Sequence, residues 1–133
     1  MASIFSKIVN GEIPCYKIAE TENCLAFLDV NPLVEGHVLV VPKKEVDYIF
    51  DLDDAVLCEM HLLSKQVAKA IKKIIHCKRI GVAVVGLEVP HAHIHLVPLN
   101  TIGDINFSRP KMKISNAELE EVGARIAEAY SNL

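Results

Sequence analysis

Tryptophan is absent from this 133-residue sequence, and aromatic residues make up only 5% of it. Surfaces that bind single-stranded nucleic acid stack bases on aromatic side chains, so the composition does not predict such a surface. The net charge of −3 likewise gives no general attraction to nucleic acid or to an anionic membrane. An anionic ligand would therefore have to be bound by local groups.

Paired cysteines and long apolar runs are also lacking. The four cysteines are scattered without a Cys-x-x-Cys pair, which argues against a structural zinc site and against a disulfide framework. No apolar run approaches the roughly 20 residues of a membrane-spanning helix. The N-terminus has neither the basic region nor the apolar stretch of a signal peptide. We therefore expect a cytoplasmic protein that binds neither membranes nor nucleic acid.

What is present is the composition of a folded domain, with 51% hydrophobic and 23% charged residues. The length suits one domain that spans residues 1–133, and no repeat or linker divides the chain.

The spacing of apolar residues predicts the elements of this domain. Apolar residues recur at steps of three and four between Asp53 and Ile75, which predicts a long helix. Ser115 begins a capping box, which predicts a C-terminal helix that runs toward Tyr130. The other predicted elements are a short helix at 3–11 and strands at 15–20, 24–30, 37–42, 78–86 and 89–99. Short turns favour an antiparallel sheet with helices packed on one side, so the predicted fold class is α+β.

Three of the six histidines alternate within "VPHAHIHLVP", residues 89–98. Residues two apart on an extended strand share one face and lie about 6–7 Å apart. His91, His93 and His95 are therefore expected to point the same way, while the apolar residues between them point into a core.

Three interpretations of this histidine cluster are open on the residues alone. The first is a polar strand face with no chemistry. The second is a metal site, but the outer histidines would stand about 13 Å apart along a strand, and no cysteine lies nearby. The third is nucleophilic catalysis on phosphorus, because imidazole, with an ordinary pKa of about 6.5, is largely neutral at pH 7. Flanking histidines could fix the tautomer of the nucleophile and donate to phosphoryl oxygens, so we favour the third interpretation.

The segment "HAHIHLV" at 91–97 fits the pattern His-x-His-x-His-x-x of the histidine triad (HIT) family, and the chain resembles that family over roughly its whole length. "IFSKIVNGEIP" and "CLAFLDVNPLVEGHVLVVPKK" carry the rest of the resemblance, which is to the nucleoside phosphoramidase-like branch. It implies a five-stranded antiparallel sheet with one long and one C-terminal helix, and a homodimer whose sheets join across the long helices and the apolar "GVAVVG". It also implies a purine nucleotide substrate, and neither a metal nor another cofactor.

The resemblance further implies a role for each histidine. His93 would attack the α-phosphorus and form a covalent nucleotidyl-histidine. His95 would donate to a phosphate oxygen, and His91 would set the orientation and tautomer of His93. His37 matches a fourth histidine of the family and would assist the phosphate site or proton transfer, although the sequence alone leaves it open as a surface residue.

A nucleoside pocket is implied by the same resemblance. Its residues would be Ile4, Phe5, Phe27, Leu28, Asp29 and Val30. Apolar and aromatic side chains can enclose a base, and the Asp29 carboxylate can accept hydrogen bonds from ribose hydroxyls. Without the resemblance, core packing would explain the apolar members equally well, and turn chemistry would explain Asp29.

The link before the triad, "VAVVGLEVPH", departs from the family pattern because it is short and lacks an identifiable phosphate-binding Asn. Glu88 and Val89 are predicted to reach the nucleotide site. An ionised Glu88 would repel a phosphate, or contact an amine leaving group, or point to solvent.

The predicted activity is cleavage of a nucleoside 5′-monophosphate from a phosphoramidate or acyl leaving group. The alternatives are a dinucleoside polyphosphate hydrolase, a nucleotide-binding or scaffolding protein with incidental turnover, and a metalloenzyme that uses the histidines. The segment at 105–115 could close over the active site or reach a partner subunit, and the sequence does not decide between these.

Overall fold

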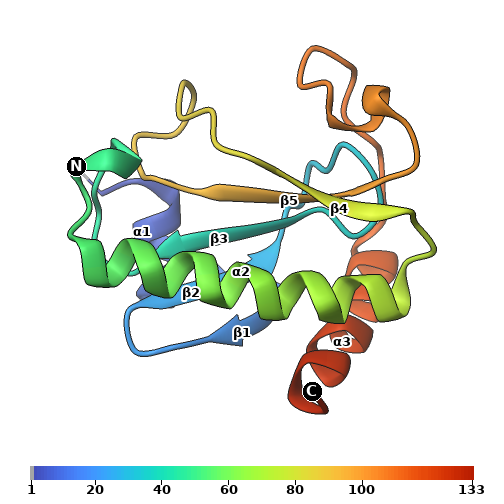
Figure 1. Cartoon of the computed structure of the whole chain (residues 1–133), viewed down its shortest axis with the longest axis horizontal. Helices are drawn as coiled ribbons and strands as arrows, with labels where there is room; N and C mark the ends of the chain where they lie inside the picture. Colours follow the sequence, from blue (N-terminus) through green and yellow to red (C-terminus); the bar gives the residue numbers. More distant parts are fainter. Residues whose placement is uncertain (1) are drawn as a thin grey trace.

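The structure, a computed structural model, describes residues 2–133. Its elements follow the predicted order of strands and helices (Figure 1). In chain order they are α1 (Ile4–Val9), β1 (Lys17–Glu20), β2 (Cys24–Leu28), β3 (Val38–Pro42), the 3₁₀ turn η1 (Ile49–Asp51), α2 (Asp54–Ile74), β4 (Arg79–Ala83), β5 (Ile94–Leu99), the 3₁₀ turn η2 (Ile102–Ile105) and α3 (Asn116–Ser131). Within residues 2–133, no helix combines the length and the apolar character that a membrane crossing requires.

The five strands form one antiparallel sheet in the order β1-β2-β3-β5-β4. The first three strands follow one another along the chain, but β5 enters between β3 and β4. In that position Val40 pairs with Ile94 and Leu39 pairs with His95. The predicted α+β class, with its five-stranded sheet, long helix and C-terminal helix, is confirmed.

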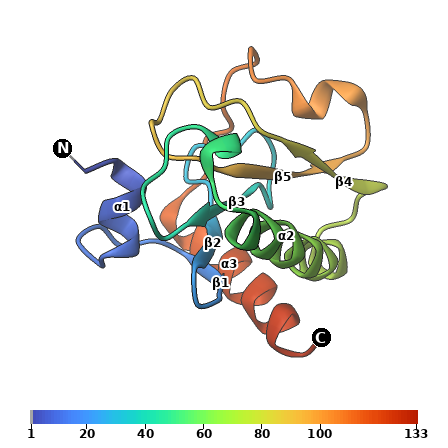
Figure 2. The same ribbon diagram turned by 60° about the vertical axis from the view of Figure 1, so that its left-hand side comes forward.

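The central strands of the sheet are buried on both faces, while β4 at the edge has no buried residue. One face packs with α2 and α3 around a large core in which Val40, Ile71, Ile94 and Ile126 are fully buried. The other face packs against α1 in a smaller cluster that includes Phe5. Figure 2 shows α1 at the left and α2 at the right of the view. Because β2 and β3 contact both clusters, every residue in these strands is buried, which explains their unbroken apolar runs.

Polar caps fix the starts of the helices where the sequence predicts them. The Ser3 side chain caps α1, the Asp53 carboxylate accepts from Val56 N–H at 2.9 Å at the start of α2, and Ser115 caps α3. Each cap satisfies a backbone donor that has no partner inside the helix.

The predicted strand at 89–99 is wrong over its first half, because β5 begins only at Ile94. Residues 89–93 form irregular backbone. There the His91 N–H donates back to the Val89 carbonyl in a tight turn, and the Ala92 N–H donates to the Val46 carbonyl instead of a strand partner. The preceding strand also stops early, since β4 ends at Ala83 and leaves 84–86 outside the sheet. Two of the three alternating histidines therefore lie on the approach to β5 and not within it.

Candidate active site

His93 presents one free ring nitrogen to a cavity. Its Nδ1 lies 2.7 Å from the His91 carbonyl oxygen, and because a carbonyl only accepts, Nδ1 must carry the proton. In the neutral ring, Nε2 is then unprotonated and holds a lone pair. The ring is packed edge-on against Phe5 and His95, at centroid distances of 5.0 and 4.8 Å, which fixes its orientation. His93 therefore has the tautomer that a nucleophilic imidazole requires.

His91 faces away from this cavity. Its Nε2 donates to the Pro42 carbonyl at 2.7 Å, so its Nδ1 accepts from the Ser3 hydroxyl at 2.8 Å. The side chain is fully buried beneath α1. The family resemblance implies that His91 fixes the tautomer of His93. In the structure the backbone carbonyl of His91 can do this. The imidazole of His91 instead links the end of β3 to the start of α1.

Glu45 also binds the start of α1, which holds Ser3, the hydrogen-bond partner of His91. The sequence alone does not predict a role for Glu45. One oxygen of its carboxylate accepts from the Ser3 N–H at 2.6 Å and from the Ser6 hydroxyl at 2.7 Å. The hydrogen bonds from Ser3 and Ser6 lower the pKa of Glu45 to about 2, so the carboxylate is ionised at neutral pH. Its charge lies at the N-terminal end of α1, where the unpaired N–H groups of the helix favour an anion.

His37 and His95 form a second hydrogen-bonded pair with a defined proton arrangement. The Leu33 N–H donates to Nδ1 of His37 at 3.0 Å, so the proton of neutral His37 sits on Nε2. That nitrogen lies 2.9 Å from Nδ1 of His95, which accepts, and the proton of His95 is left on Nε2. His95 is thus arranged to donate a hydrogen bond from the same cavity that His93 lines.

Both members of this pair are neutral at pH 7. Burial, followed by the charges of His95, Lys111 and His93, lowers the pKa of His37 to about 3. Burial and the charges of His93 and Lys111 lower the pKa of His95 to about 4. The hydrogen bond from His95 to a ligand is therefore made by an uncharged ring.

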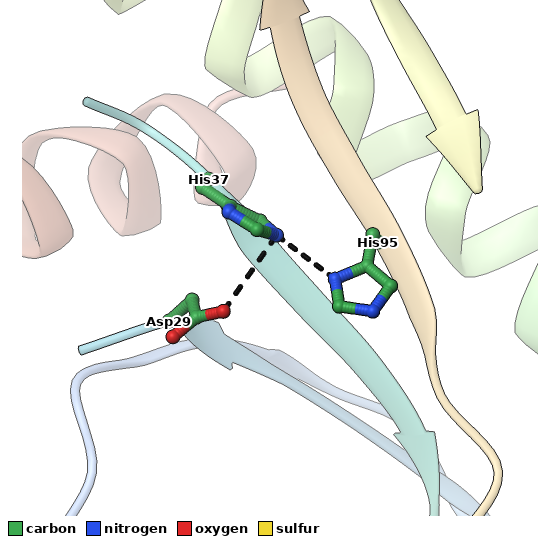
Figure 3. A group of neighbouring side chains, drawn as sticks. All are labelled: Asp29, His37 and His95. Carbon is green, nitrogen blue, oxygen red and sulfur yellow. Dashed lines mark hydrogen bonds and ion pairs between the residues drawn. The ribbon is translucent and has the colours of Figure 1, made fainter. Parts of the chain in front are cut away.

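Asp29 lies at the end of β2 beside this pair (Figure 3). One carboxylate oxygen is 3.7 Å from Nε2 of His37, and the other accepts from the Asn31 N–H at 2.8 Å. Burial raises the pKa of Asp29 above its ordinary value. The carboxylate lines the cavity, where it can accept hydrogen bonds from a ligand.

Asp29, His37 and His95 could also hold a metal ion, because their ligand atoms all lie within 4.8 Å of one another. Two nitrogen ligands of a tetrahedral zinc ion stand about 3.3 Å apart, given bond lengths of about 2.0–2.1 Å. Nε2 of His37 and Nδ1 of His95 are 2.9 Å apart, which is the length of a hydrogen bond and shorter than the separation of two zinc ligands. Zinc would have to separate these rings. This set includes only one member of the triad, so the metal site considered from the sequence differs from the one that the geometry offers.

The cavity has a volume of about 410 Å³, which is within the range of small-molecule sites. Besides His93 and His95, it is lined by all eight residues that were predicted to bind the nucleotide: Ile4, Phe5, Phe27, Leu28, Asp29, Val30, Glu88 and Val89. Apolar residues make up most of the lining, and α1 and β2 contribute five of them. Lys111, His93 and Glu88 lie close enough to Asp29 to affect its pKa, and we call the part of the cavity that these four residues and His95 line its polar end. This division suits a ligand with one apolar ring system and one charged group.

Among the lining residues that were not predicted, Phe107 and Lys111 bring an aromatic ring and a charged group to the cavity. They come from the connection between η2 and α3, whose sequence shows no periodicity or motif. The predicted alternative that this segment reaches the active site agrees with their position.

Known proteins resemble this chain in sequence and in structure. Residues 10–102 match the HIT domain family. An adenosine 5′-monophosphoramidase of Schizosaccharomyces pombe is 36% identical over 129 residues, which cover 96% of this chain and 97% of that protein. An adenylylsulfatase of Arabidopsis thaliana is 33% identical over 100 residues, which cover 71% of this chain and 51% of that protein. A zinc-bound histidine triad family protein from Mycobacterium smegmatis has a TM-score of 0.82 at 28% identity, over 99% of this chain and 95% of that one.

Proposed function

Because this chain belongs to the HIT domain family, we propose that it cleaves a nucleoside 5′-monophosphate from a phosphoramidate or acyl leaving group through a covalent nucleotidyl-histidine. The observation that carries the proposal is the hydrogen bond from Nδ1 of His93 to the His91 carbonyl, which leaves Nε2 free in the cavity. The names of the relatives, a monophosphoramidase and an adenylylsulfatase, agree with a nucleotidyl group as the transferred unit.

In the first step, the lone pair on Nε2 of His93 attacks the α-phosphorus. A phosphorus–nitrogen bond forms, the bond from phosphorus to the leaving group breaks, and the leaving group departs with the electron pair of that bond and a proton taken from solvent. The attacking ring becomes cationic, and its Nδ1–H already donates to the His91 carbonyl, which stabilises that charge. The Nε2–H of His95 donates to a non-bridging oxygen of the phosphoryl group. Water then attacks phosphorus, releases His93 and yields the monophosphate.

The base would occupy the apolar end of the cavity between α1 and β2, against Phe5 and Phe27. The ribose would lie beside Asp29, whose second carboxylate oxygen is available to its hydroxyls. Glu88 also lines the cavity, and its carboxylate disfavours a leaving group that carries further phosphates. A phosphoramidate or acyl leaving group therefore suits the site better than a dinucleoside polyphosphate.

The direct test is AMP release from adenosine 5′-phosphoramidate by the purified protein, before and after exhaustive treatment with a chelator. We expect release at a rate that the chelator does not change, because the proposed steps use only imidazole groups. Metal content measured on the same samples is the control. Loss of activity that zinc restores would contradict this mechanism and would indicate a metal at Asp29, His37 and His95. Tight AMP binding without release would instead favour a nucleotide-binding role.

We further propose that residues 1–133 act as a single HIT domain and that two copies associate through an apolar face. Phe50, Leu62 and Val82 are 72%, 64% and 59% exposed, and Tyr48 and Val84 are exposed beside them. Tyr48, Phe50 and Val84 line one hollow, and exposed apolar residues of this kind are typical of an interaction surface. Sedimentation at micromolar concentration should give a dimer, and Val82→Asp should shift it toward monomer. Ile102→Asp is the matched control, because Ile102 is 88% exposed on η2; a monomeric wild-type protein would contradict the proposal.

A further inference from the structure

The connection between η2 and α3, residues 106–115, covers the hydrogen-bonded histidine pair. The ring of Phe107 packs edge-on against His95 at 4.7 Å between centroids and against His37 at 6.4 Å. The connection is tied to the turn before β3, because the Met112 N–H donates to the Pro32 carbonyl at 2.8 Å. Phe107 therefore has a fixed place at the polar end of the cavity.

Phe107 in turn orients Lys111. The Lys111 ammonium lies 5.2 Å from the centroid of the Phe107 ring, which is within the range of a cation–π interaction. Lys111 lines the cavity together with His93 and His95, and its charge is close enough to contribute to the lowered pKa values of His37 and His95. None of the ion pairs within 4.0 Å found among residues 2–133 includes Lys111.

The other charged groups around the cavity are carboxylates, which makes the positive charge of Lys111 important for binding an anion. Asp29 and Glu88 bring carboxylates to the cavity wall, and His95 is neutral. His93 must also be neutral in order to attack. Among the described residues that line the cavity, Lys111 is the only lysine or arginine. A phosphoryl group that enters this cavity brings negative charge into a region that already holds two carboxylates, and the Lys111 ammonium group can offset part of that charge.

We propose that Lys111 binds the phosphate charge of the nucleotide, with Phe107 holding its ammonium group over the polar end of the cavity. Lys111 would then make the site prefer nucleoside monophosphates over nucleosides, which share the base and ribose contacts. This inference rests on the proposed function only in that the cavity takes a nucleotide. It does not depend on turnover.

The test compares the affinities of AMP and adenosine by calorimetry for the wild-type protein, Lys111→Met, Lys111→Arg and Lys113→Met. Methionine keeps the length and apolar character of the lysine stem and removes only the charge. We expect Lys111→Met to weaken AMP binding about fivefold, which is typical of one partly exposed charge pair, and to change adenosine binding less than twofold. Lys111→Arg should restore most of the AMP affinity. Lys113 is exposed on the same connection but does not line the cavity, so Lys113→Met should bind both ligands as the wild type does.

An equal loss of affinity for AMP and adenosine in Lys111→Met would overturn the inference, because it would show a structural role. Unchanged AMP affinity in that variant would overturn it as well. Adding AMP release from adenosine 5′-phosphoramidate separates the two proposals. Phosphate-dependent binding that requires Lys111 without release would support this inference and contradict the proposed activity. AMP release together with an AMP affinity that Lys111→Met leaves unchanged would support the proposed activity and overturn this inference.

Discussion

His93→Ala is expected to lower the rate of AMP release from adenosine 5′-phosphoramidate by at least about 10³-fold, because no other group replaces an attacking nucleophile. The affinity for AMP should change far less, since the base, ribose and phosphate contacts remain. The measurement is a single-turnover assay of AMP formation combined with calorimetric AMP binding. The rate should fall with nearly unchanged affinity, which is the pattern of a group that acts mainly in the transition state.

His76→Ala is the matched control for this variant. His76 is exposed beyond the end of α2 and does not line the cavity, so its removal should leave the rate unchanged. Acid quenching of the wild-type reaction followed by peptide mass spectrometry should find the nucleotidyl group on the peptide that contains His93. Substantial turnover by His93→Ala, or an adduct on another residue, would place the nucleophile elsewhere.

The second large effect expected is a loss of stability on mild acidification. His37 and His95 have pKa values of about 3 and about 4 in the folded protein, while an unfolded chain titrates near the ordinary value of about 6.5. Below pH 6.5 the unfolded state therefore binds protons that the folded state does not. The stability from these groups is fully present above pH 6.5 and is lost as the pH falls toward 4. Between pH 7 and pH 5 the free energy of unfolding should fall by about 4 kcal/mol, close to 2 kcal/mol for each histidine.

Urea titrations at a series of pH values from 7 to 5 would measure this slope. Staying above pH 5 avoids most of the titration of Glu45 and Glu59, whose pKa values of about 2 act only in stronger acid. In His37→Gln the slope should fall to about half, because one of the two groups is gone. His76→Gln changes an exposed histidine outside the site and should keep the wild-type slope. A wild-type protein whose stability does not vary between pH 7 and pH 5 would show that the buried histidines titrate normally.

Most of the fold follows from the sequence because its apolar periods are unambiguous. The steps of three and four from Val56 to Ile74 specify α2, and the capping box at Ser115 is a local pattern that predicts the start of α3. The start of β5 does not follow. Alternation alone extends the strand back to Val89, but the conformation of His91 depends on Ser3 and on Pro42, which are distant in the chain. Such partners are invisible to any local pattern.

The candidate site likewise contains residues that the sequence predicts and residues that it does not. His93 and His95 could be predicted because they belong to a motif of alternating histidines. The pocket residues near the N-terminus could be predicted from the family resemblance. Glu45, Phe107 and Lys111 reach the site only because α1 and the 106–115 connection fold over the sheet. Their residue types are ordinary in surface segments, so their sequence neighbours give no sign of a role. The structure is needed to find them.

The place of β5 in the sheet has a consequence for biosynthesis. During translation, β3 emerges before α2 and β4, yet its second neighbour in the sheet is β5, which emerges after both. Until β5 leaves the ribosome, one edge of β3 has no strand partner and offers open backbone groups, a state that nascent chains must be protected from. The same strand brings His95 to His37 and follows His93 directly. A chain that ends before β5 lacks His95, so the proposed active site forms only when β5 closes the sheet.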